Sequence, residues 1–343
     1  MWKSGAIFLL LPFLLTACQS VSEPNDAGIP DKVKGSPSLS TVNKASITKP
    51  VTVGTYFDFM DSLVRIYQEQ LPEPYGEHLI ARANPWLIDT LAHTDYYYLK
   101  SKGVFNYDQK ALVVLKPGDQ LLIPDSTQID SLVKLFATTI LDINIPEYKL
   151  HIRQGETLVQ SFPIRVGRNE HKYLAMAGRR VDLRTRTGVG RIVRISRNPT
   201  YINPSNNHVY TQTRRDDNKV TLLPQIPWLE PEVDGHRYGQ LIHPTTNPIT
   251  LGKAYSNGCI GTGEGDAWRI YYYAPLGTRI VIRYDLEVVD EQGDTTKLRN
   301  IYPGFEQKEA VEWPLPTIAA TLSNVLDPEA EKCSCLADAG IWE

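Results

Sequence analysis

Residues 253–262 read KAYSNGCIGT and place one cysteine, Cys259, between two glycines in a polar run. A cysteine thiol has a pKa of about 8.5, so a nucleophilic cysteine needs a base beside it. His243 ends the strand-like segment YGQLIH, and a loop leads from it to Cys259. A strand end and a returning loop can bring two such positions together. We therefore predict that His243 takes the thiol proton and later gives it to a leaving amine.

The residues before Cys259 suit a tight turn. Gly258 allows the backbone to turn sharply, and Ser256 offers a hydroxyl that can fix the turn. The backbone N–H groups of Gly258 and Cys259 are predicted to point at a developing oxyanion. These residues alone are equally consistent with an ordinary turn around a small buried cysteine.

The net charge and the missing motifs argue against several classes of protein. A formal charge of −3 over 343 residues argues against a nucleic-acid partner, which requires a basic surface. The sequence has no His-Glu-x-x-His or Gly-x-Ser-x-Gly motif, which argues against the zinc peptidase and serine hydrolase classes, and its other histidines have no metal-ligand spacing. Cys333 and Cys335 lie close to the end of the sequence given, and their role stays open because a disulfide between them would be strained.

The sequence opens with Lys3 and an apolar run over residues 6–15 that is too short to span a bilayer. The run is followed by Leu-Thr-Ala-Cys at 15–18, which resembles the lipobox of bacterial lipoproteins. The resemblance implies a signal peptide over 1–17, lipid on Cys18 and a place in the bacterial cell envelope, facing the periplasm. An ordinary secretory signal with an incidental cysteine is the alternative.

The rest of the chain divides by composition and periodicity. Residues 18–50 are rich in Ser, Pro, Asp, Asn and Lys and predict a flexible tether. Residues 51–130 predict a small α+β domain, and 137–290 a mostly β domain with short helices. Residues 291–343 form a C-terminal extension of weak pattern.

Five elements within these two domains can be predicted individually. Residues 56–71 have helical periodicity, and two short strands flank the Pro-Gly-Asp turn at 117–119. A helix is predicted to begin at the N-cap Asp266 and to stop at Pro275, with its aromatic residues facing the core. Residues 277–290 predict one long final strand.

The segment from about 138 to 285 resembles the catalytic domain of the L,D-transpeptidases, the YkuD-type family. That family carries a histidine, a loop and then Ser/Thr-His-Gly-Cys; here these are His243 and Ser256-Asn257-Gly258-Cys259. TRTG at 185–188 and GDAWRIYYYAPLGTRIVI at 265–282 also resemble family segments. The resemblance implies a β-sandwich or barrel in which Cys259 is the nucleophile and His243 the base.

The same resemblance implies a substrate and a reaction, and it implies no metal and no organic cofactor. Cys259 would attack a peptidoglycan stem peptide at the carbonyl of its third residue and form a thioester. An amine on a second stem would then give a 3→3 cross-link. A water acceptor would make the protein an L,D-carboxypeptidase. A third alternative is a non-catalytic wall-binding lipoprotein that keeps the fold.

Two residues depart from the family pattern beside the nucleophile. Asn257 stands where histidine is usual, and Gly261 stands where arginine is common. If that arginine holds the substrate, another residue must replace it, and Asn257, Arg214, Arg215 and Arg237 are the candidate substrate contacts. Within 51–130, LIARANP and VLKPGDQLLIP partly resemble a LysM peptidoglycan-binding module; a packing domain without ligand is the alternative.

Overall fold

The computed structural model describes residues 43–289 and 293–305. The predicted signal peptide, Cys18, most of the tether, Cys333 and Cys335 lie outside these residues. Within the described ranges, every helix is too short or too polar to cross a bilayer.

The N-terminal part is an α+β unit, as predicted. Its elements are β1 (Lys44–Ser46), β2 (Val51–Thr52), η1 (Val53–Thr55), α1 (Tyr56–Ile66), α2 (Gly76–Ala83), α3 (Pro85–Ala92), α4 (Tyr96–Ser101), η2 (Gln109–Ala111), β3 (Val113–Leu115), β4 (Gln120–Leu122) and α5 (Ser126–Thr138). The helix predicted at 56–71 is α1, whose Phe59 and Leu63 are fully buried. A proline at N1 starts α3 directly after α2 ends, since proline needs no helical N–H partner there.

The structure places the start of this unit earlier than the sequence did. β1 lies inside the range predicted as tether. Its residues alternate in burial: Ala45 and Ile47 are buried, whereas Lys44 and Ser46 are exposed, as in a strand with one face against the core. β1 pairs with β4, and β2 pairs with β3. The two strands around the Gly118 turn therefore exist, but each pairs with a strand from the start of the unit.

The β part is built on one eight-stranded sheet. Its elements are β5 (Thr139–Asn144), β6 (Lys149–Gln154), β7 (Thr157–Pro163), β8 (Val166–Gly167), β9 (His171–Leu174), η3 (Ala175–Ala177), β10 (Arg179–Asp182), β11 (Gly188–Ser196), β12 (Tyr201–Ile202), β13 (Val209–Tyr210), β14 (Gln212–Arg214), β15 (Val220–Leu222), β16 (Trp228–Val233), β17 (Ile242–Pro244), η4 (Pro248–Thr250), β18 (Ala254–Ser256), β19 (Ile260–Thr262), α6 (Glu264–Tyr273) and β20 (Arg279–Arg283). The sheet order is β19-β17-β16-β11-β20-β5-β6-β7, and β5, β6 and β7 form the expected meander.

The two edges of this sheet meet. Arg165, just after edge strand β7, forms an antiparallel bridge with Gly261 in the other edge strand, β19. Its N–H donates to the Gly261 carbonyl at 2.8 Å, and the Gly261 N–H donates back at 3.0 Å. The sheet is thereby closed into a near-barrel, which leaves fewer unpaired edge groups.

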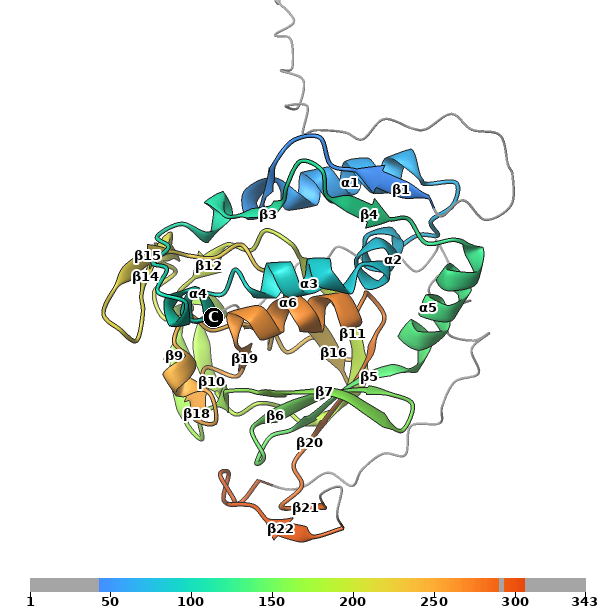
Figure 1. Ribbon diagram of the computed structural model, residues 1–343. Coiled ribbons are helices and arrows are strands. Elements are labelled where there is room, and N and C mark those ends of the chain that lie inside the picture. The colour runs from blue at the N-terminus through green and yellow to red at the C-terminus, as the bar shows by residue number, and fades with distance from the viewer. Residues whose placement is uncertain (1–42, 290–292, 306–343) are drawn as a thin grey trace, which may run out of the picture.

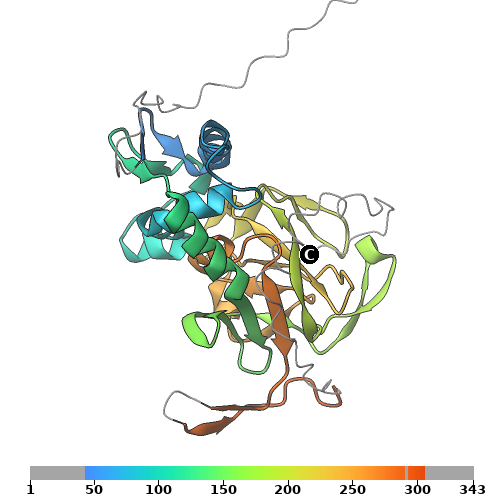
Figure 2. The same cartoon turned by 90° about the vertical axis from the view of Figure 1, so that its right-hand side faces the viewer.

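Helix α6 joins the two parts of the chain. Figure 1 shows it between α3 and the sheet, and Figure 2 shows the N-terminal helices gathered on one side of the strands. Trp268, Tyr271 and Tyr272 of α6 are buried, as predicted. The Tyr272 hydroxyl lies 2.6 Å from that of Tyr56, and Trp268 stacks on Phe57, so residues of both parts form one core.

Two predicted boundaries in the β part are wrong. Gly263, rather than Asp266, is the N-cap of α6, because the helix already includes the buried Glu264. The predicted final strand is interrupted: β20 ends at Arg283, and β21 (Glu287–Val289) pairs with β22 (Thr295–Lys297). The interruption follows from Asn144, whose side-chain oxygen accepts from the Asp285 N–H and turns the chain away from the sheet.

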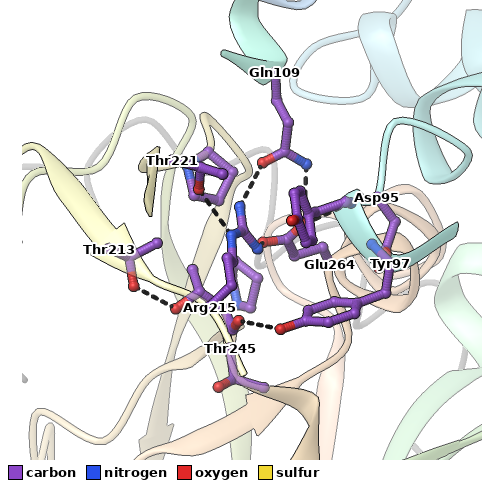
Figure 3. A network of polar contacts seen from close by, with 12 residues as sticks. Asp95, Tyr97, Gln109, Thr213, Arg215, Thr221, Thr245 and Glu264 are labelled. Carbon is purple, nitrogen blue, oxygen red and sulfur yellow. Dashed lines mark hydrogen bonds and ion pairs between the residues drawn. The ribbon is translucent and has the colours of Figure 1, made fainter. Parts of the chain in front are cut away.

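A buried ion pair lies where the N-terminal part meets α6. Arg215, from the turn between β14 and β15, contacts the Glu264 carboxylate and donates to Thr221 Oγ1 at 2.8 Å. Gln109 of the N-terminal part donates to Glu264 and accepts from Arg215 (Figure 3). Three segments distant in sequence are therefore held by charge-assisted hydrogen bonds.

Replacing Arg215 with alanine is expected to lower the free energy of unfolding by about 3–5 kcal/mol, because it leaves a buried carboxylate without its counter-charge. Arg214→Ala, at the exposed neighbouring position, should cost roughly 0.5 kcal/mol or less. Urea unfolding of both variants measures the difference. Equal losses for the two variants would contradict the role of the ion pair.

The deficit of Arg215→Ala should also depend on pH. Burial raises the pKa of Glu264 even with Arg215 present, and loss of the guanidinium should raise it further. A carboxyl with a raised pKa in the folded state stabilises the fold at low pH and loses that effect as pH rises. The deficit relative to wild type should therefore be smaller at about pH 5 than at about pH 8.

Candidate active site

His243 and Cys259 lie on neighbouring parallel strands. β17 pairs with β19 in the register Ile242↔Ile260 and His243↔Gly261, and the Ile260 N–H donates to the Leu241 carbonyl at 2.8 Å. Cys259 directly precedes β19, so it stands level with Leu241. Residues two apart on a strand point to the same face. His243 and Cys259 are therefore diagonal neighbours on one face of the sheet.

Trp228 of β16 packs beside both residues. Its ring lies 5.2 Å from the His243 ring, and it forms a small apolar cluster with Leu241 and Cys259 against which Tyr201 packs. Cys259 is 3% exposed and His243 5% exposed. The two residues of the predicted pair thus lie on one face of the sheet with their side chains almost completely buried.

The His243 ring is held in one tautomer. Its Nδ1 lies 2.9 Å from the backbone carbonyl oxygen of Pro244. Because a carbonyl can only accept, Nδ1 must carry the proton and donate. In the neutral ring Nε2 then has the lone pair, which is what a general base requires.

Backbone groups surround the sulfur of Cys259. The Leu241 N–H donates to Sγ at 3.3 Å, and Sγ lies 3.8 Å from the Gly239 carbonyl oxygen. A hydrogen bond from an N–H to the sulfur favours its thiolate form. The strand pairing that places Leu241 level with Cys259 also supplies this donor.

Ser256 fixes the turn before Cys259, as predicted from the sequence. Its hydroxyl donates to the Cys259 carbonyl at 2.6 Å and accepts from the Gly258 N–H at 3.1 Å. Gly258 has φ +120°, a conformation that residues with a side chain rarely adopt. Thr185, within the TRTG segment, donates to the Gly258 carbonyl at 3.0 Å and accepts from Gly167.

The oxyanion role predicted for Gly258 is not met by its N–H in this arrangement, because that N–H donates to Ser256. The sequence predicts that Gly258 lies in the turn, but it does not show that the Gly258 N–H already donates a hydrogen bond to the Ser256 hydroxyl.

A cavity of about 300 Å³ opens beside the histidine. Its lining includes His243, Asn257 and residues from several other segments: Arg165, Arg168, Tyr201, Ile202, Asn203, Pro204, Tyr210, Leu223, Trp228, Pro244, Thr245, Thr246, Asn247, Tyr255 and Ser256. Cys259 itself is not among the residues that line the cavity. The cavity can hold a short peptide segment against the histidine.

Of the predicted substrate contacts, only Asn257 lines the cavity. Arg215 is 2% exposed and pairs with Glu264, so that prediction is wrong. Arg237 lies outside the lining and holds Glu230 with two hydrogen bonds of 2.7 and 3.0 Å. Arg214 is exposed on β14 and also lies outside the lining.

The sequence reasoning missed Arg165 and Arg168, which both line the cavity. Arg168 Nη2 donates to Asn257 Oδ1 at 2.5 Å, so the unusual asparagine has a partner of its own. Gly261 was the available signal, because glycine inside a strand often marks a close approach by another group. Among the described residues, no cluster of three His, Cys, Asp or Glu side chains could hold a metal ion.

A comparison with known families bears on this arrangement. Residues 138–282 match the family model YkuD, the L,D-transpeptidase catalytic domain. This part of the chain is therefore similar to the YkuD catalytic domain. The match begins at the last residue of α5 and ends inside β20, so the matched segment contains all of the eight-stranded sheet except Arg283, together with His243, Cys259 and α6.

Solved structures similar to this chain include several L,D-transpeptidases. One from Mycobacterium smegmatis has 14% identity over 43% of this chain and 58% of its own, with a TM-score of 0.29. L,D-transpeptidase 3 from Mycobacterium tuberculosis, solved with a faropenem-derived adduct, has 14% identity over 42% and 60%, with a TM-score of 0.27. One from Xylanimonas cellulosilytica has 13% identity over 62% and 94%, with a TM-score of 0.32.

The alignments to the two mycobacterial structures thus span less than two thirds of those chains. No curated protein sequence matches this chain.

Ser256→Ala should weaken the turn that carries Cys259. The change removes the hydroxyl that bonds both the Gly258 N–H and the Cys259 carbonyl, and it leaves two buried groups without that partner. We expect a loss of about 1–3 kcal/mol in the free energy of unfolding, measured by urea titration. Ser205→Ala, in the exposed loop between β12 and β13, is the control; a matching loss there would count against the assignment.

Proposed function

We propose that this protein is a cysteine-dependent L,D-transpeptidase that acts on peptidoglycan stem peptides. The observation that carries the proposal is the placement of His243, with Nδ1 donating to Pro244, diagonal to Cys259 on paired strands of the segment that matches the YkuD domain. The cavity beside the histidine supports a peptide substrate.

In the acylation step, His243 Nε2 takes the thiol proton of Cys259, and Sγ attacks the carbonyl of the third residue of the donor stem. The S–C bond forms, and the C–N bond to the terminal D-alanine then breaks. The proton on Nε2 passes to the departing amine. The Leu241 N–H stabilises the thiolate before the attack.

In the second step an amine of an acceptor stem attacks the thioester. The new C–N bond forms as the S–C bond breaks, and His243 takes the amine proton and returns it to sulfur. The product with a second stem is a 3→3 cross-link, and another amine would become attached in the same way. A site of low water content favours an amine over water as the acceptor.

One observation favours a second candidate, a non-catalytic peptidoglycan-binding protein with this fold. Cys259 is 3% exposed and packs against Leu241 and Trp228, so the donor carbonyl reaches sulfur only if the lining residues shift. A buried cysteine that never meets substrate would behave as a small apolar residue.

Turnover of a disaccharide-tetrapeptide separates the candidates. Dimer with D-alanine release supports transfer, tripeptide alone supports an L,D-carboxypeptidase, and no product favours the binding protein. Cys259→Ala should abolish turnover, and His243→Gln should lower it by about 10²–10⁴-fold. His236→Gln, an exposed histidine in the preceding turn, should leave it unchanged.

Mass spectrometry after exposure to imipenem gives a second measurement. Wild-type protein should gain one acyl adduct that maps to Cys259, and Cys259→Ala should gain none. An adduct on Cys333 or Cys335, with Cys259 unmodified, would overturn the proposal.

We further propose that the protein is held in the bacterial envelope by lipid on Cys18, with residues 18–43 as tether and the N-terminal unit as a LysM-like wall-binding module. The support is the lipobox-like sequence at 15–18 and the partial LysM resemblance. Several acyl chains on this one residue would anchor the chain firmly. Cys18→Ser should move the protein from the membrane fraction to the soluble fraction of cells; unchanged membrane association would argue against the anchor.

A further inference from the structure

The loop over residues 245–251, here named the wall loop, follows β17 and forms one wall of the cavity. It lines the cavity with three polar residues, Thr245, Thr246 and Asn247. Two backbone hydrogen bonds hold its ends: the Thr245 N–H donates at 2.7 Å to the last residue of β19, and the Gly252 N–H donates at 2.9 Å to the residue after β7. Side chains from other parts of the chain contact its middle.

Tyr97, in α4 of the N-terminal part, is one of these contacts. Its hydroxyl donates to the Thr246 carbonyl oxygen at 3.5 Å and accepts from the Asp216 N–H at 2.8 Å. The contact with Asp216 is the shorter and therefore the stronger of the two. The Asp216 carboxylate in turn accepts from the Ile249 N–H at 2.9 Å. One hydroxyl therefore acts on the wall loop at two points, directly at Thr246 and through Asp216 at Ile249.

The β14–β15 hairpin, to which Asp216 belongs, is held by the same N-terminal segment. The Tyr96 hydroxyl donates to the Asp217 carboxylate at 2.9 Å. The Tyr107 hydroxyl accepts from the Gln212 side chain at 2.7 Å. The position of the hairpin is therefore coupled to α4 and to the segment that follows α4.

The hairpin also contacts the wall loop directly. The hydroxyls of Thr213, in β14, and Thr246 lie 2.9 Å apart. Figure 3 shows the side chains of Tyr97 and Thr213 pointing toward this segment from two sides. Tyr97 lies outside residues 138–282, so the segment that matches the family does not supply this contact by itself.

We propose that Tyr97 is a positioning residue of the active site, because its hydroxyl fixes the wall loop and thereby the polar groups that meet a bound peptide. N–H···O hydrogen bonds have lengths of about 2.7–3.2 Å, so a shift of the loop by about 1 Å would break those that it makes with a ligand. The N-terminal part thus completes the cavity of the β part. The identity of the peptide rests on the proposed function, whereas the positioning of the wall loop does not.

Hydrogen–deuterium exchange of the full chain tests the positioning by itself. Tyr97→Phe removes the hydroxyl and keeps the ring, so amide exchange in residues 246–251 should become faster by about threefold or more. Tyr98→Phe is the matched control, since this neighbouring tyrosine is exposed and stacks on His93, and it should leave the exchange unchanged. Exchange in β5 and β6 should keep the parent rate in both variants, which distinguishes a local effect from a loss of global stability.

Binding of a disaccharide-tetrapeptide, measured in a Cys259→Ala background, tests the consequence for the active site. Tyr97→Phe should weaken this binding by about three- to tenfold. In the turnover assay it should raise KM by a similar factor and leave kcat nearly unchanged. A variant that only folded less well would instead lower kcat, because less of the protein would be active, and would leave KM unchanged.

A double-variant cycle tests the path through Asp216. Asp216→Ala removes the carboxylate that accepts from the Ile249 N–H but keeps the backbone N–H that donates to Tyr97. If both residues act on the wall loop along one path, the double variant should weaken binding by less than the product of the two single effects. Independent, multiplying effects would contradict this path.

Unchanged exchange in residues 246–251 of Tyr97→Phe would overturn the inference, and so would unchanged peptide affinity in that variant when the parent binds the peptide. Equally faster exchange in β5 and β6 would also overturn it, since the loss would then be one of general stability. Faster exchange confined to residues 246–251, with no peptide bound by the parent, would support the positioning of the wall loop and refute the proposed substrate.

Discussion

Two backbone hydrogen bonds between Arg165 and Gly261 close the sheet, and the site depends on this closure. They bring the segment after β7 against β19, directly after the nucleophile. β8 can then pair with β18, and the Gly167 region with Thr185 supports the turn that carries Cys259. Without closure, these segments would belong to opposite edges of an open sheet.

The site combines rigid backbone with few charged groups close to the sulfur. His243 is oriented by a carbonyl, Cys259 receives an amide N–H, and the turn is fixed by one hydroxyl. These partners do not titrate in the physiological range, so they keep their geometry when a proton moves between sulfur and imidazole. The permanent positive charges come from the arginines of the neighbouring segment, where they face the cavity.

The sequence predicted those features of the site that depend on neighbouring residues along the chain. Gly258 and Ser256 could be placed in a turn from the conformations that their residue types favour, and the family resemblance identified His243 and Cys259. Arg165 could not be predicted, since its neighbour Gly261 is distant in sequence and meets it only when the sheet closes. Arg215 was misjudged for the same reason: its partner Glu264 belongs to another element, and burial of the pair leaves no trace in the local pattern.

Helix α6 and the N-terminal helices share one hydrophobic core, so the two parts of the chain do not separate into independent folding units at the boundary of the family match. Residues 138–282 match a family as one block, yet Trp268 and Tyr272 within that block pack on Phe57 and Tyr56 outside it. A fragment cut at the family boundary would present these aromatic rings to water and tend to aggregate. The segment that matches the family is therefore shorter than the segment that packs as one core. If residues 138–282 were joined to another protein, other residues would have to pack against α6 in place of the N-terminal helices.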